Sequence, residues 1–184
     1  MSNILKTPTF RASYPAIFRP NKEDFGGGFS VVAIFPKGTD ISEIKKLANA
    51  TAKEKWPNKI PKFKHIVFHK CEEKEDDDGN LPDGYEAGGT YITLKSKRQV
   101  PVVDSARQPI DDEHGFKAGD WARAGIVCYA YDNNFGKGIG FGLRALQKVR
   151  DGEPLGSSIK AEDFFEAVEG EDVESDASSD DAFS

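Results

Sequence analysis

The sequence contains few of the residues that build metal centres and disulfide frameworks. Its 184 residues include two cysteines, Cys71 and Cys128, and three histidines, His65, His69 and His114. The cysteines lie far apart and fit no zinc-finger spacing, so we expect free thiols. The residues between His65 and His69 are typical of a strand, where a separation of four gives no paired ligand face. The sequence therefore predicts neither a metal site nor a cofactor.

Long apolar runs are absent as well. No run approaches the roughly 20 residues that a membrane-spanning helix needs. The first residues, Met1 to Lys6, lack the basic-then-apolar pattern of a signal peptide. We therefore expect no membrane partner and a cytoplasmic location. The proportions of hydrophobic residues, 38%, and charged residues, 30%, are ordinary for a globular chain of one domain.

The sequence also lacks a convincing catalytic set. Most acidic residues stand in charged runs, which are usually solvated, and no nucleophile, base and orienting acid are related by spacing. The glycines of residues 136–140 lack the Lys-Ser/Thr ending of a phosphate-binding loop. Asp111, Asp112 and Glu113 could bind a divalent cation, but an exposed turn is the interpretation that we favour. We predict a protein that is not an enzyme, and keep a metal-dependent nucleic-acid enzyme as an alternative.

Basic residues are missing from the C-terminal end. Residues 161–184 hold ten of the 31 acidic residues and none of the 25 basic ones, whereas in residues 1–160 the basic residues outnumber the acidic ones. This division predicts a folded body, residues 1–160, and a disordered acidic tail, residues 161–184. Asp180, Asp181 and Phe183 end the tail with an aromatic side chain that invites a pocket on a partner protein. A tethered polyanion also competes with phosphates for a basic body, because the tether raises its effective concentration.

The pattern of the body predicts mainly β structure. One helix is expected at about residues 41–55, where Ile41, Ile44, Leu47 and Ala48 recur at helical spacing. Strands are expected at about residues 9–19, 29–35, 66–69, 91–97, 100–103, 121–131 and 137–146, with a turn at 132–134. Strands and helices do not alternate regularly, so a parallel sheet is not expected. A closed five-stranded β-barrel of the oligonucleotide-binding (OB) type fits best, with an inserted helix and extra strands.

Aromatic and basic residues are interleaved along these strands. A protein that binds single strands without regard to sequence needs aromatic faces for bases and cations for phosphates. We predict that the following residues bind DNA: Arg11, Tyr14, Phe18, Arg19, Tyr91, Lys95, Lys97, Arg98, Trp121, Arg123, Tyr129, Tyr131, Phe135, Lys137 and Arg144. Aromatic residues on strands are more often core residues, so a minority of this set is expected to be exposed.

Alternation within two strands narrows the choice. In residues 121–131, Ile126, Cys128 and Ala130 fall on one face, and the other carries Trp121, Arg123, Val127, Tyr129 and Tyr131. The first face predicts core and the second a stacking platform. In residues 137–146 the three glycines 138, 140 and 142 share a face opposite three large apolar residues. Such bare backbone marks close approach by a ligand or by another part of the chain.

The chain resembles a family of phage single-stranded DNA-binding proteins. The resemblance covers nearly the whole chain and is carried by Arg11–Pro15, Gly119–Trp121, Tyr129–Asn133, Gly138–Leu143 and Gln147–Glu153. It implies an OB fold, a groove for single-stranded DNA, and a role in phage DNA replication or recombination in the bacterial host. It also implies an acidic tail that contacts replication or recombination proteins and occupies the groove when DNA is absent. Many tails of this kind end on Phe, whereas here Ser184 follows.

Two other functions remain open at this stage. One is the nucleic-acid enzyme using the acidic residues near 111–113. The other is a protein-interaction module whose acidic segments mimic DNA. A homo-oligomer is also conceivable, because an OB barrel has an edge strand that can pair.

Overall fold

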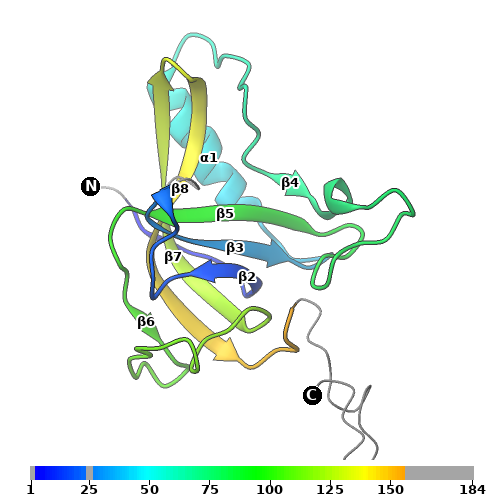
Figure 1. Ribbon diagram of the computed structural model, residues 1–184. Coiled ribbons are helices and arrows are strands. Elements are labelled where there is room, and N and C mark those ends of the chain that lie inside the picture. Colours follow the sequence, from blue (N-terminus) through cyan, green and yellow to red (C-terminus); the bar gives the residue numbers. More distant parts are fainter. Residues whose placement is uncertain (1–2, 24–26, 156–184) are drawn as a thin grey trace, which may run out of the picture.

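The computed structural model describes residues 3–23 and 27–155 (Figure 1). The elements in chain order are β1 (Leu5–Lys6), β2 (Phe10–Ala16), β3 (Phe29–Phe35), α1 (Ser42–Lys55), β4 (His69–Lys70), the 3₁₀ helix η2 (Cys71–Lys74), β5 (Thr90–Ser96), β6 (Val102–Val103), β7 (Trp121–Asn133) and β8 (Gly136–Arg150). The predicted acidic tail, with Asp180, Asp181 and Phe183, lies outside the described residues.

Five of the strands close into a barrel. β2 pairs with β3, β3 with β5, β5 with β8, β8 with β7, and β7 again with β2. The β5–β8 pair is parallel, whereas the other four are antiparallel. In chain order the third and fifth barrel strands therefore meet in parallel, which is the closure of an OB barrel. The predicted fold class is confirmed, with β1, β4 and β6 as the extra strands.

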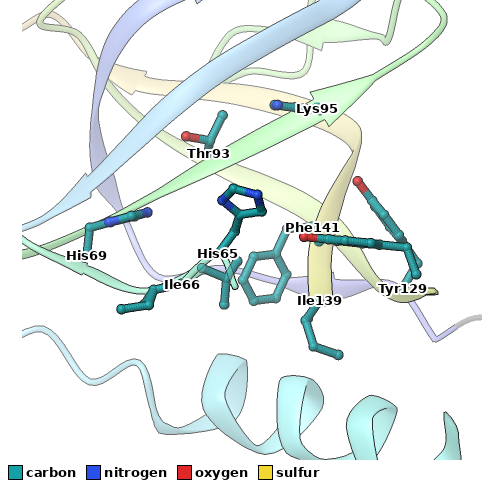
Figure 2. Close-up of a pocket in the computed structure, with 11 residues that line it drawn as sticks. His65, Ile66, His69, Thr93, Lys95, Tyr129, Ile139 and Phe141 are labelled. Carbon is teal, nitrogen blue, oxygen red and sulfur yellow. The ribbon is translucent and has the colours of Figure 1, made fainter. Parts of the chain in front are cut away.

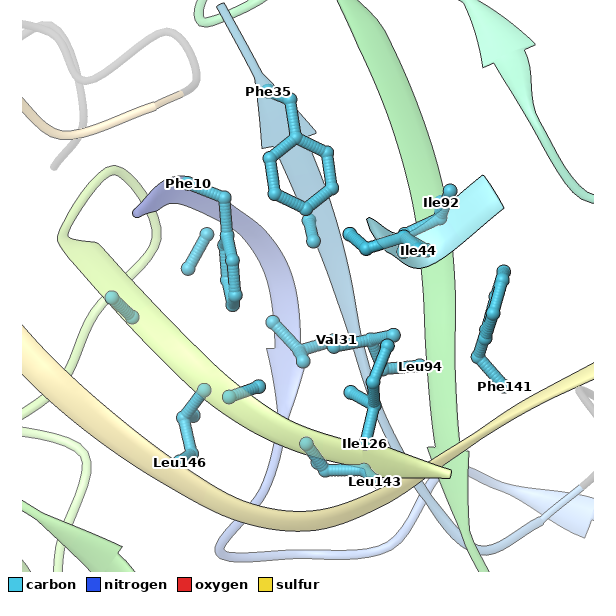
Figure 3. Close-up of a cluster of buried hydrophobic side chains, with 14 of the residues drawn as sticks. Phe10, Val31, Phe35, Ile44, Ile92, Leu94, Ile126, Phe141, Leu143 and Leu146 are labelled. Atoms are coloured by element: carbon cyan, nitrogen blue, oxygen red, sulfur yellow. The ribbon is translucent and has the colours of Figure 1, made fainter. Parts of the chain in front are cut away.

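The barrel encloses one apolar core, to which the strands contribute alternate residues (Figure 3). Phe10 and Phe35 pack edge to face with ring centroids 5.7 Å apart. Ile92, Leu94 and Ile126 are fully buried around them. A second, smaller cluster lies outside the barrel and consists of Ile34, Cys71, Tyr85 and Tyr91. Burial raises the pKa of the Cys71 thiol, as expected of an inert structural cysteine.

Helix α1 follows β3 and covers the barrel beside the β7–β8 hairpin (Figure 1). Its buried residues, Ile44, Ala48 and Ala52, recur every four positions and form one apolar stripe. The carboxylate of Asp40 accepts a hydrogen bond from the backbone N–H of Ser42 at 3.0 Å, and hydrogen bonding to Ser42 lowers the pKa of Asp40. The predicted helix is therefore confirmed, one residue shorter at its start.

The hairpin of β7 and β8 is longer than the sequence predicts. Asp132 and Asn133 continue β7 instead of forming the turn, which falls on residues 134–135. The side chain of Asn133 holds this turn by accepting a hydrogen bond from the Phe135 N–H at 2.9 Å. β8 carries one extra residue at Arg144, because Ile126 pairs with Leu143 but Gly125 pairs with Ala145.

Other strands differ from the prediction at positions where the backbone is irregular. β1 is not predicted, because two residues are too few to show alternation. Of the predicted strand 66–69 only His69 lies in β4. Pro15 lies within β2 at a shift of register between Ser13 and Ala16, which suits a residue that has no N–H to donate.

The end of β8 is fixed to the barrel by a buried ionic cluster. The fully buried carboxylate of Asp120 lies 3.2 Å from the ammonium of Lys148 and accepts hydrogen bonds from the N–H groups of Lys117 and Gly152. Lys148 also reaches Asp151 at 2.6 Å. Such a cluster holds residues 148–152 in one place, because an unpaired buried carboxylate would be costly.

Candidate nucleic-acid interface

A groove runs over the outer surface of β5, β7 and β8 and has two adjoining compartments. We call the first, of about 780 Å³, the channel. The second, of about 230 Å³, we call the pocket (Figure 2). Lys95 and Tyr129 line both compartments, so the two adjoin at these residues. In an OB barrel the second and third strands and two of the loops form the usual oligonucleotide surface. Here these are β3, β5, the β2–β3 loop and the β7–β8 hairpin, and the groove lies on this surface.

Four cations line the channel: Lys95, Lys97, Arg98 and Arg144. All four are exposed, and none forms an ion pair with another residue in the described part of the chain. Lys95 comes from β5, Lys97 and Arg98 from the bend that follows it, and Arg144 from the extra residue of β8. Exposed cations gathered around one channel are suited to bind the phosphates of a nucleic acid.

Two tyrosines from β7 lie against bare backbone of β8. Tyr129 pairs with Gly140 and Tyr131 with Gly138. A Cβ atom on either glycine would overlap the facing tyrosine ring. Tyr129 is 45% exposed, and burial of its remaining surface raises the pKa of its phenol, which is therefore neutral at pH 7. The glycine face predicted from the sequence is thus covered by part of the same chain, and the rings lie flat on the sheet.

The pocket has an apolar floor and a polar rim. Ile139 and Phe141 of β8, both nearly buried, form part of the floor, and Phe68 packs edge to face on Phe141 at 5.7 Å. His65 and Thr93 line the same pocket from the loop before β4 and from β5 (Figure 2). The surface therefore offers both flat apolar contact and hydrogen-bonding groups.

His69 closes one side of the pocket and has a fixed ring. Its Nδ1 lies 2.9 Å from the Glu73 carboxylate, and its ring stacks on Tyr91 with centroids 4.9 Å apart. The hydrogen bond with His69 lowers the pKa of Glu73, so this carboxylate is ionised and accepts the bond. The backbone N–H of Lys70 also points to Glu73, at 3.3 Å.

Several residues predicted to bind DNA do not line the groove. Tyr91 is buried in the second cluster. Trp121 lies at the start of β7, between the guanidinium groups of Arg11 and Arg150, whose centres stand 5.9 and 4.8 Å from its ring. Eight residues separate Trp121 from Tyr129, roughly 26 Å along a strand. The predicted platform therefore spans the molecule and does not form one site.

Other members of the predicted set have partners elsewhere. Arg11 donates to the carbonyl of Glu153 at 2.7 Å, and Arg123 to the side chain of Gln147 at 2.7 Å. Phe18 and Arg19 lie beside the loop of residues 111–114, where Arg19 pairs with Glu113 at 3.3 Å. Tyr14 lies in β2, but its side chain is not described.

The two remaining residues of the predicted DNA-binding set, Phe135 and Lys137, lie at the tip of the β7–β8 hairpin. Phe135 is 82% exposed, and Lys137 pairs with Asp132 at 3.5 Å. Lys64, from the basic loop after α1, packs against Gly136 at this tip. Phe135 is therefore available to a ligand that extends beyond the pocket.

The structure adds groove residues that the sequence does not single out. They are His65, Ile66, Val67, His69 and Thr93 in the pocket, and Phe29 and Ser96 in the channel. Ile66 is 65% exposed, which is unusual for an isoleucine beside a polar rim. In the sequence, the one indication that this loop belongs to the groove is the group of basic residues just before Ile66, namely Lys59, Lys62 and Lys64.

Two of the acidic residues at 111–113 have partners, since Glu113 pairs with Arg19 and Asp112 is bonded within its own loop. The Asp112 carboxylate accepts hydrogen bonds from the N–H groups of His114 and Gly115, at 3.0 and 3.2 Å. Within residues 3–23 and 27–155 there is no group of three or more His, Cys, Asp or Glu side chains that could hold a metal ion.

Helix α1 does not have the properties of a membrane span. It is neither long enough nor apolar enough to cross a bilayer.

Comparison with known proteins identifies relatives over almost the entire chain. A family model described as "Enterobacter phage Enc34, ssDNA-binding protein" matches residues 3–178. Protein p50 of Acyrthosiphon pisum secondary endosymbiont phage 1 is 33% identical over 180 residues, which cover 92% of this chain and 97% of p50.

Solved structures share the fold at lower identity. The single-stranded DNA-binding protein of bacteriophage Enc34, in complex with single-stranded DNA, has a TM-score of 0.69 and 21% identity, covering 83% of this chain and 89% of that one. Gp2.5 of bacteriophage T7, also a single-stranded DNA-binding protein, has a TM-score of 0.55 and 16% identity, covering 90% of this chain and 98% of that one.

Proposed function

Because this chain belongs to the family of the Enterobacter phage Enc34 single-stranded DNA-binding protein, we propose that it binds single-stranded DNA in the groove. The observation that carries the proposal is the groove itself, where four unpaired cations border an exposed tyrosine on the OB binding surface. Phosphates lie along the channel cations, and their neutralisation supplies the salt-dependent part of the affinity.

Stacking supplies the part of the affinity that does not depend on salt. The ring of Tyr129 presents one face to the groove, since its other face lies on the backbone of Gly140. A stacked base contributes about 1–3 kcal/mol, and every base has a face to stack. The contact therefore favours single strands over duplexes without selecting a sequence. Phe135 at the hairpin tip is a second stacking position in this proposal.

A titration of fluorescent oligo-dT tests the groove. We expect the wild-type chain to bind, with an affinity that falls steeply as salt increases. Tyr129→Ala should weaken binding by roughly tenfold or more at every salt concentration, because it removes a stacking face. Tyr129→Phe keeps the ring and should restore most of the affinity. If Tyr129→Ala bound as well as the wild type, the groove would not be the binding surface.

The acidic tail has a separate role in the proposal. Residues 161–184 carry ten acidic residues and no basic residue, which suits them to compete with phosphates for the channel cations. Asp180, Asp181 and Phe183 would dock replication or recombination proteins, with the aromatic side chain as the anchor. The body, residues 1–160, is in this view the DNA-binding domain.

The proposal includes the biological setting of the binding. We place the protein in DNA replication or recombination of a phage, in the cytoplasm of the bacterial host. Among the described strands β1 pairs only with β7, so its other edge is open to a second copy, and a homo-oligomer would form there.

The proposal assigns no catalytic activity. Incubation of end-labelled single strands with the protein and magnesium checks this point, and the strands should keep their length. Shortened products would favour the metal-dependent enzyme instead.

A further inference from the structure

The pocket differs from the channel in chemistry as well as in size. Among the described residues, Lys95, at the junction, is the one lysine or arginine that lines the pocket. Its floor includes Ile139 and Phe141, and tyrosine rings flank it from β7. Hydrogen-bonding side chains, His65, His69 and Thr93, stand around it (Figure 2). A flat apolar surface bordered by polar groups matches a heterocycle better than it matches a phosphate.

We propose that the pocket takes one unstacked nucleobase of the bound strand, held by its faces and its polar edge. The inference rests on the proposed function, because it names what a strand in the groove places in this compartment. The pocket volume, about 230 Å³, suits a single base and not a stacked pair. A strand whose phosphates follow the channel would turn one base inward where Lys95 and Tyr129 join the two compartments.

The orientation of His69 supports a base with a polar edge. Glu73 accepts the hydrogen bond from Nδ1–H, and Tyr91 holds the ring plane by stacking. The tautomer with its proton on Nδ1 presents Nε2 to a ligand as a hydrogen-bond acceptor. Thr93 adds a hydroxyl that can donate or accept. These groups meet the exocyclic amino and ring N–H groups of bases, which a phosphate lacks.

A phosphate is the alternative occupant, because Lys95 and two imidazoles could also surround an anion. The distinction can be measured with two oligomers of equal length, oligo-dT and a strand with abasic residues throughout. Both carry the same phosphates, but only the first carries bases. The abasic strand has no register in which a base can reach the pocket.

The test compares pocket variants of the full chain on both strands. His65→Ala removes an exposed side chain and Thr93→Val keeps the shape of its side chain, so both should fold. Each is expected to weaken oligo-dT binding roughly three- to tenfold, the effect of one lost hydrogen bond, and to leave abasic binding unchanged. Arg144→Ala is the matched channel control, which should weaken both strands equally and reduce the salt slope by about one.

The outcomes separate the inference from the function on which it rests. If the pocket variants weaken both strands alike, the pocket holds a phosphate and the inference is wrong. If they weaken neither, the pocket is not used. If the wild-type chain binds neither strand, the proposed function itself fails. If the pocket variants weaken the binding of oligo-dT alone, the result supports a nucleobase in the pocket.

Discussion

At the scale of single residues, alternation along a strand is the strongest guide to the site. It separates the buried face of β7, with Ala124 and Ile126, from the face that carries Tyr129. Alternation does not predict the burial of Tyr91, which shares its face of β5 with the exposed Lys95. The acidic segment after β4 folds back and buries Tyr91 against Tyr85, a contact that no local period encodes. His65 and Ile66 were missed because a loop has no period at all.

The glycines of β8 give a prediction at this scale. In Gly140→Ala the new methyl group would overlap the Tyr129 ring, which must swing away from the sheet. We expect several-fold weaker oligo-dT binding, although no group that contacts DNA has been removed. Fluorescence titration measures this loss, and thermal unfolding measures the accompanying strain.

Gly125→Ala on β7 is the matched control. Its methyl group would meet only the exposed Ile4 side chain, at 3.1 Å, outside the groove. Equal affinities for the Gly125→Ala and Gly140→Ala variants would show that Gly140 does not position Tyr129 for binding.

At the scale of elements, the strands that the sequence predicts best are those without irregularities. β3 is predicted to the residue, from Phe29 to Phe35. The prediction for β8 stops at residue 146, because the extra residue at Arg144 shifts the buried positions from odd to even numbers. The alternating sequence pattern therefore ends where the strand bends. The same bend places Arg144 in the channel.

The ionic cluster at the end of β8 gives a prediction for stability. Lys148→Met leaves the fully buried Asp120 with Lys117, at 3.5 Å, as its one cationic partner among the described residues. We expect a loss of roughly 3 kcal/mol in the free energy of unfolding, because the buried carboxylate loses its main counter-charge. Chemical denaturation measures this loss. Oligo-dT affinity of the folded protein should not change.

Lys117→Met is the comparison for the stability change. The Lys117 side chain is 44% exposed, so its pairs are screened by water and should contribute less than about 1 kcal/mol. Equal losses for the two variants would contradict the role assigned to Lys148.

At the scale of the whole molecule, the division of charge between body and tail is the feature that the sequence indicates most clearly. The excess of acidic residues in 161–184, against a body with more basic than acidic residues, is visible without any structure. The groove cannot be seen in the sequence, because its residues come from β3, β4, β5, β7, β8 and the segments between strands, which only barrel closure brings together. Fold class follows from local patterns, whereas the composition of the site depends on topology.

The tail gives a prediction at this scale. A chain truncated after residue 160 should bind oligo-dT more tightly than the full chain at low salt, because a competing polyanion has been removed. The difference should shrink at higher salt, where attraction between charges is screened. Titrations of both chains at two salt concentrations measure it.

A chain of full length with the ten acidic residues of the tail replaced by Asn or Gln separates charge from length. It should bind like the truncated chain. Equal affinities of the full and truncated chains at low salt would rule out competition by the tail.

The barrel has two short joints, β2 with β7 and β5 with β8, and the second bears on the groove. β5 and β8 meet through two residue pairs, Leu94 with Phe141 and Lys95 with Gly142, whereas β7 and β8 share thirteen. The β5–β8 joint lies beneath the groove, since Lys95 and Gly142 line the channel. Backbone amides at so short a seam should exchange with solvent sooner than those of the long hairpin. In the proposed complex, a strand of DNA in the channel would contact both β5 and β8. Binding of DNA should therefore oppose local opening of the barrel at this seam.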